Sequence, residues 1–316
     1  MTSTTESSTV RAPRSVRQVG DRVFVGLARG AGILILVVLA GVAVFLIAEA
    51  VPALLAPAGD LPEGHSLVAY IAPLVFGTVL SATIALVVAT PLGVGVALFI
   101  SHYAPRRIAQ TLGYLVYLLA AVPSFVYGLW GAAVLGPASV GLATWLNVWF
   151  GWLPFFAGPV SATGRTMLVA GLVLAVMILP IITAVSREVF RQTPKLHEEA
   201  ALALGATRWE MIRMAVLPFG RSGVISGAML GLGRALGETM AVAIVLSVSG
   251  AVTVNLISSG NPSTIAANIA LQFPESSGLA VNALIASGLL LFVITLLVNA
   301  AARAIVNRRR EFSGAN

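Results

Sequence analysis

Six long apolar runs restrict the folds open to this 316-residue chain. They cover about residues 31–48, 70–100, 112–135, 166–186, 222–250 and 280–302. A helix needs about 20 apolar residues, within a range of roughly 17–25, to cross the hydrocarbon core of a bilayer. Only 10% of the residues are charged, against about a quarter in an average soluble domain. The sequence therefore predicts an all-α integral membrane protein with six transmembrane helices.

The basic residues predict how these helices are oriented. Six spans that cross the membrane in turn place every second connecting segment on the same side as the two termini. Of the 19 Lys and Arg residues, all except Arg165 and Arg234 lie in the segments on that side. These segments are residues 1–29, 101–111, 187–221 and 303–310. Because basic loops remain in the cytoplasm, both termini are expected to be cytoplasmic. The net charge of +7 therefore reflects topology, and no nucleic-acid partner is predicted, since such a partner requires a basic face on a soluble fold.

Composition divides the chain into four predicted segments. Residues 1–29 are expected to form a disordered cytoplasmic tail, rich in Ser, Thr and Arg near its start. Residues 30–65 hold the first transmembrane helix and a periplasmic loop, and this helix is too long to be a cleaved signal peptide. Residues 66–305 form the core of spans, and residues 306–316 a basic cytoplasmic tail. Pro91 and Pro123 predict kinks or breaks inside the second and third spans.

A tryptophan-rich stretch, TWLNVWFGWLPFF, lies in the predicted outer loop of residues 136–165. Trp145, Trp149 and Trp152 follow the spacing of one helical face. Tryptophan is enriched in the headgroup layer, so an interfacial helix is expected. A docking surface for an external protein is compatible with that interpretation.

Two charges within the fifth apolar run, Arg234 and Glu238, need a separate explanation. Arg234 lies 13 residues beyond Arg221, or roughly 20 Å along a continuous helix, within a layer about 30 Å thick. A charge at that depth costs about 2.5–3.5 kcal/mol on insertion scales. The spacing would let the two side chains meet, but such pairs contribute only about 0.2–0.5 kcal/mol on exposed helices. A purely structural ion pair remains an alternative, but the pair contributes much less free energy than the burial of the charges costs.

Glycines on the same predicted helix continue this stripe. Gly220, Gly223, Gly227 and Gly231 share a face with the two charges, and small residues allow close approach of either another helix or a substrate. The charges favour a translocation path along this face. The planar guanidinium of Arg234 would bind an oxyanion, and Glu238 would orient the guanidinium and keep the binding reversible. Arg234→Ala or Glu238→Gln is then expected to insert normally but to transport poorly.

The segment from Arg187 to Pro218 is too polar to span a membrane and too long for a simple connector. Pro194 and the acidic residues after it predict a helix start, and Gly205 predicts a turn before a second helix through Trp209. A helical hairpin that protrudes into the cytoplasm suits a partner protein.

This hairpin resembles the EAA loop of ABC-importer permease subunits, here spanning residues 191–218. In that family the loop forms the coupling helix that fits a groove on the ATP-binding subunit. Ala215 replaces the isoleucine usual before Leu-Pro. The resemblance implies a type I, MetI-like permease fold and assigns ATPase coupling to Glu199, Ala200, Ala201, Gly205, Leu217 and Pro218.

Two further stretches resemble permeases of phosphate ABC importers of the PstC type. GRALGETMAV contains Arg234, Glu238 and Thr239, and continues with Met-Ala where the PstA type has Ala-Pro. AAVPSFVYGLWG places Ser124 and Tyr127 near a helix break. The resemblance implies that these five residues line the substrate pathway.

The same resemblance implies an assembly in the bacterial cytoplasmic (inner) membrane. A PstA-like permease would complete the channel as a heterodimer, and two PstB-like ATP-binding subunits would lie beneath it. A PstS-like extracytoplasmic protein would deliver phosphate. The chain itself lacks the Gly-Lys-Ser/Thr of a P-loop, so ATP and Mg²⁺ are expected on the partner. No catalytic residue or bound cofactor is expected on this membrane-embedded chain.

Other functions remain open at this point. Arginine alone does not distinguish phosphate from sulfate or molybdate, so a permease for another oxyanion is the nearest alternative. An anion transporter driven by an ion gradient would be expected to show inverted repeats and further buried acids, and a receptor or scaffold would need no buried charge. Cysteine is absent and the three histidines are scattered, so no metal site is predicted.

Overall fold

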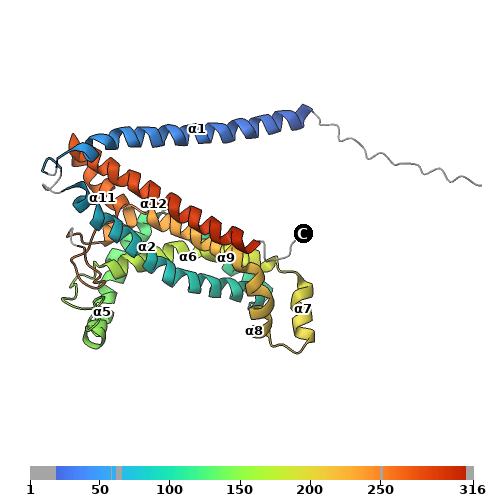
Figure 1. Ribbon diagram of the computed structural model, residues 1–316. Helices are drawn as coiled ribbons and strands as arrows, with labels where there is room; N and C mark the ends of the chain where they lie inside the picture. The colour runs from blue at the N-terminus through green and yellow to red at the C-terminus, as the bar shows by residue number, and fades with distance from the viewer. Residues whose placement is uncertain (1–18, 58, 62–65, 250–251, 311–316) are drawn as a thin grey trace, which may run out of the picture. The chain divides into compact units, whose positions relative to one another are not determined.

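The computed structural model describes most of the chain (Figure 1). The described residues are 19–57, 59–61, 66–249 and 252–310. Residues 1–18 of the predicted disordered tail and residues 311–316 of the predicted C-terminal tail lie outside them. The described fold is helical, apart from one isolated bridge between Val248 and Asn261.

The chain divides into two compact units, Met1–Ala48 and Glu49–Asn316, with the boundary inside helix α1, Val19–Leu55. The helix begins before the apolar run, so the prediction of disorder is wrong for residues 19–29. Asp21 in the first turn favours a helix start here, because its charge complements the positive end of the helix dipole. Apolar side chains such as Leu34 are exposed in the first unit, as expected for a lipid-facing helix.

The second unit holds the other helices. Their bounds are α2 Leu67–Leu98, α3 Arg106–Ala120, α4 Ser124–Trp130, α5 Gly136–Phe150, α6 Met167–Arg191, α7 Lys195–Ala203, α8 Arg208–Met211, α9 Leu217–Leu236, α10 Met240–Val245, α11 Ile265–Gln272 and α12 Leu279–Arg310. Helices α7 and α8 project at one end of this unit, and α5 lies at the other end (Figure 1).

Six helical segments in the described part of the chain are long and apolar enough to cross a membrane, which confirms the predicted number. They are Gly20–Leu55, Leu67–Tyr103, Ser124–Phe150, Met167–Arg191, Arg208–Leu236 and Leu279–Ala304.

Two of these spans are displaced along the chain from the predicted ranges. The third begins at Ser124 rather than near residue 112, because the chain breaks at Pro123 and leaves α3 as a separate helix. The fifth includes α8, the second helix of the predicted hairpin, and ends at Leu236. Pro91, by contrast, lies inside an uninterrupted α2, so no break occurs there.

The tryptophan-rich stretch does not form a separate interfacial helix. Trp145 and Trp149 lie on α5, which continues the third span through a π-helical turn, and Trp152 follows the end of that helix. All three side chains are exposed. The predicted outer loop of residues 136–165 is therefore wrong over α5, because the apolar pattern continues through Gly136 without a stop.

Helix α6 forms the centre of the second unit, packed against α2 and α9. Leu174, Ile178 and Ile182 on α6 are fully buried. A side-chain carbon added at Gly171 would lie 2.5 Å from Ile84 of α2, so glycine is what allows these two helices to approach.

Candidate functional site

The fifth span breaks at Gly237. Helix α9 ends at Leu236 and α10 begins at Met240, so the predicted continuous helix through residue 250 is wrong. Glycine weakens a helix by about 1 kcal/mol relative to alanine, and Gly233 and Gly237 both fall at this end. The Gly-Glu-Thr stretch therefore forms a polar interruption within an apolar helix.

Glu238 stabilises the restart of the helix after this break. Its Oε1 accepts a hydrogen bond from the backbone N–H of Ala241 at 3.1 Å, one of the N–H groups that a helix start leaves unpaired. The carboxylate is buried, with 8% of the residue exposed. Thr239 donates its hydroxyl to the carbonyl of Gly237 at 3.2 Å. Both polar side chains of the break thus satisfy local backbone groups.

Arg234 lies in the last turn of α9 and is half-buried. No salt bridge joins it to Glu238 in the described structure, so the predicted contact between the two side chains is not formed. The guanidinium of Arg234 also makes no hydrogen bond to any other described residue. A permanent charge is therefore held beside the break with its donors available.

Helix α4 brings Tyr127 and Ser124 to the same region. A side-chain carbon added at Gly128 would lie 2.8 Å from the Cα atom of Ala241, so the α4 and α10 backbones approach closely there. Tyr127 is buried, donates its hydroxyl to the carbonyl of Leu119 at 2.7 Å, and lies within electrostatic range of Arg234. Ser124 is half-buried at the first position of α4, and its hydroxyl has no hydrogen-bond partner among the residues described.

The glycine stripe of α9 packs against α6 and does not line a path. An added carbon at Gly231 would lie 3.2 Å from Ile182, and one at Gly223 would collide with Val189. The interpretation of this stripe as a pathway wall is therefore wrong, and the alternative of helix packing holds. The open side of α9 is instead that of Gly233, which has no atom within 4 Å of an added carbon.

The hairpin predicted to face the cytoplasm consists of α7, a tight turn and α8. Gly205 has φ +85, a left-handed conformation that glycine adopts without steric cost. Thr207 and Glu210 form a reciprocal capping box at the start of α8. The chain then continues through a π-helical turn, Ile212–Val216, directly into α9. A force on the hairpin would therefore act on the span whose last turn carries Arg234.

The predicted coupling residues occupy both faces of this hairpin. Glu199 and Ala200 are exposed on α7, whereas Ala201 packs against a buried cluster containing Met211, Ile212 and Val216. Leu217 and Pro218 form the first turn of α9.

Large apolar side chains also remain exposed on the hairpin. Leu196, Leu204 and Trp209 are 73%, 90% and 55% exposed. The hairpin thus offers an uncovered apolar surface for a partner protein.

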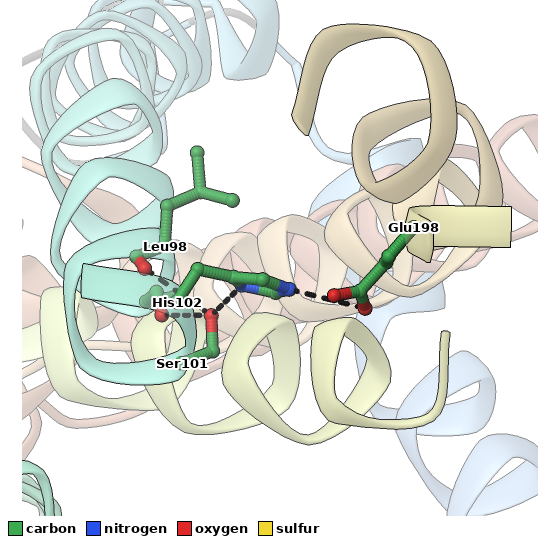
Figure 2. A network of polar contacts seen from close by, with 5 residues as sticks. Leu98, Ser101, His102 and Glu198 are labelled. Atoms are coloured by element: carbon green, nitrogen blue, oxygen red, sulfur yellow. Dashed lines mark hydrogen bonds and ion pairs between the residues drawn. The ribbon is translucent and has the colours of Figure 1, made fainter. Parts of the chain in front are cut away.

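One contact of this hairpin was not found from the sequence. Nε2 of His102 lies 3.5 Å from a carboxylate oxygen of Glu198, which ties α7 to the π-helical turn Phe99–Tyr103 after α2. Figure 2 shows the imidazole extended from this turn toward Glu198, while Ser101 contacts its other nitrogen at 2.7 Å. The two partners are far apart in the chain and neither belongs to a motif, so no local signal could have paired them.

Comparisons with known proteins agree with this architecture. Residues 89–311 match the family described as "Binding-protein-dependent transport system inner membrane component". The chain is 49% identical over 298 residues to "Phosphate transport system permease protein PstC 2" of Mycobacterium tuberculosis, a match that covers 90% of this chain and 91% of that protein. It is 39% identical over 308 residues to "Phosphate transport system permease protein PstC" of Mesorhizobium japonicum, covering 93% and 92%.

Among solved structures, inward-facing conformations of the MetNI methionine ABC transporter contain a similar chain. The TM-score is 0.52, and the match covers 77% of this chain and 95% of that chain. The sequences are 17% identical, so this likeness shows a shared fold alone.

Proposed function

The chain belongs to the family of binding-protein-dependent transport system inner membrane components, and from that premise we propose that it is the permease subunit of an ATP-driven importer of inorganic phosphate. In this role the chain is a multi-pass subunit of the bacterial inner membrane and has no catalytic chemistry of its own. The guanidinium of Arg234 beside the break at Gly237, which forms no salt bridge with a described carboxylate, supports an oxyanion as the substrate. The similarity to phosphate transport system permeases favours phosphate among the oxyanions.

The pathway runs past this break. Arg234 supplies a fork of N–H donors that matches two oxygens of a phosphate, and the hydroxyl of Ser124 is a further available donor. Glu238 caps the start of α10 through the N–H of Ala241, which stabilises the restart of the helix beside Arg234. Its charge also limits how tightly an anion is held, which lets the anion leave. Tyr127 and Thr239 complete the wall of the site.

ATP and Mg²⁺ bind together on the ATP-binding subunits rather than on this chain. The exposed apolar side chains of the α7–α8 hairpin dock on one of two PstB-like ATP-binding subunits, and Glu199 and Ala200 lie at that contact. A PstA-like permease supplies the other half of the channel, and a PstS-like binding protein delivers phosphate from outside. Membrane lipid surrounds the remaining spans. Continuity of α8 with α9 carries the motion of the hairpin to Arg234.

Uptake of labelled phosphate by cells carrying Arg234→Ala tests the proposal. Transport is expected to fall at least tenfold, because a charge-assisted hydrogen bond contributes about 1.5–3 kcal/mol, while the protein still inserts and still co-purifies with its ATP-binding subunit. Arg107→Ala, a change on α3 away from the break, is the matched control. Normal uptake by Arg234→Ala would refute the site, and competition by sulfate or molybdate as effective as by phosphate would refute the substrate.

A further inference from the structure

A cavity of about 520 Å³ lies between α3, the last turns of α6 and the π-helical turn after α2. The charge pattern places it at the cytoplasmic end of the protein. The polar side chains that line it include Arg106, Gln110, Tyr114, Tyr117, Arg187 and Arg191. None of the residues assigned to the transport pathway lines this cavity, so it is a separate site.

Arg187 is the most constrained of these side chains. Its guanidinium lies directly over Gly113 of α3, where an added side-chain carbon would be 2.5 Å from Nη1. Its Nε is buried and has no hydrogen-bond partner within the described protein. A buried N–H without a partner is unfavourable, so this group needs an acceptor that the chain does not supply.

No acidic side chain balances the arginines of the cavity. Arg106, Arg187 and Arg191 form no salt bridge with any described carboxylate. The neighbouring Glu188 accepts a hydrogen bond from Gln192 at 3.4 Å instead. Three like charges around one cavity repel one another, and an anion inside the cavity would relieve that repulsion.

We propose that this cavity binds a phosphate-bearing anion. Guanidinium groups match phosphate oxygens in bidentate geometry, and the hydroxyls of Tyr114 and Tyr117 add two neutral donors at the rim. Free inorganic phosphate in the cytoplasm and the headgroup of an anionic phospholipid in the inner leaflet offer the same chemistry. The proposal does not depend on transport of phosphate by the chain, since it concerns a different part of the molecule.

The test uses the full chain, purified with its partner subunits and carrying Arg234→Ala so that the proposed pathway does not bind phosphate. The first arm measures binding of labelled inorganic phosphate in nanodiscs of neutral phosphatidylcholine, at ionic strength matched with chloride. The second arm measures retention of phosphatidylglycerol by native mass spectrometry. Each arm compares the parent with Arg187→Gln, and with Arg107→Gln, which removes a nearby charge that does not line the cavity.

Saturable binding in either arm that weakens about tenfold or more in Arg187→Gln but not in Arg107→Gln supports the proposal, and the arm that responds identifies the source. Gly113→Ala, which displaces the guanidinium without removing charge, is expected to weaken the same arm. Arg191→Gln, at an exposed position, replaces Arg187→Gln if that variant does not fold. Absence of binding in both arms, or equal loss in Arg107→Gln, would overturn it.

Discussion

The close approach of α4 and α10 at Gly128 gives a direct test of the proposed pathway. An alanine there would place its Cβ 2.8 Å from Cα and 3.2 Å from the carbonyl oxygen of Ala241. Carbon atoms in favourable contact are about 3.5–4.0 Å apart, so the two helices must separate by roughly 0.7 Å or more. The neighbour is backbone and cannot rotate away, and Tyr127 would move with α4.

The expected cost follows from the cost of overpacking a close-packed interior, about 1–3 kcal/mol. Replacing a helical glycine by alanine also adds about 0.5–1 kcal/mol of helix stability, which obscures the cost if Gly128→Ala is compared with the wild type. Gly141→Ala removes that ambiguity, because Gly141 lies on α5 of the same span and has no atom within 4 Å of an added carbon. The difference between the two variants then reports the collision alone.

Both variants are compared by thermal inactivation in detergent and by phosphate uptake. Gly128→Ala is expected to be less stable than Gly141→Ala by about 1–3 kcal/mol and to transport less, because the wall of the site moves away from Arg234. The reasoning fails if Gly128→Ala matches Gly141→Ala in both measurements. Reduced stability with normal transport would separate the collision from the pathway and contradict the placement of Tyr127 in its wall.

Three further predictions concern the break and the hairpin. Glu238→Gln keeps an acceptor for the N–H of Ala241, so thermal stability should stay near that of the wild type while phosphate uptake falls with the lost charge. Glu238→Ala should lower phosphate uptake and should also lower stability by about 0.5–2 kcal/mol, because the cap is lost. Equal uptake by Glu238→Gln and the wild type would contradict this role. Gly205→Ala forces a left-handed residue at a cost of about 1–2 kcal/mol, so recovery of the ATP-binding subunit on affinity purification should drop, and undiminished recovery would count against coupling through this turn. His102→Ala removes the contact with Glu198 and should increase protease cleavage in α7. The control is His197→Ala, at an exposed position, and identical cleavage of the two variants would show that the contact does not hold the helix.

The sequence by itself determined the properties that depend on local composition. Hydropathy identified six spans, since each span must be apolar over its own length, and the distribution of arginine predicted their orientation. Pro194, the acidic residues after it and Gly205 located the hairpin, because helix starts and glycine turns are set by neighbouring residues. Likewise Arg234 and Glu238 were identifiable because two charges in an apolar run need an explanation wherever the helix lies.

Only the tertiary structure decided which surfaces meet. The stripe of Gly223 and Gly231 could serve a substrate or another helix, and the burial of α6 against it settled that choice. The packing of α10 against Gly128 of α4, beyond the break at Gly237, is likewise a contact between distant segments. The same holds for His102 with Glu198. Such pairings arise from packing energies summed over the whole unit, and no single stretch of sequence encodes them.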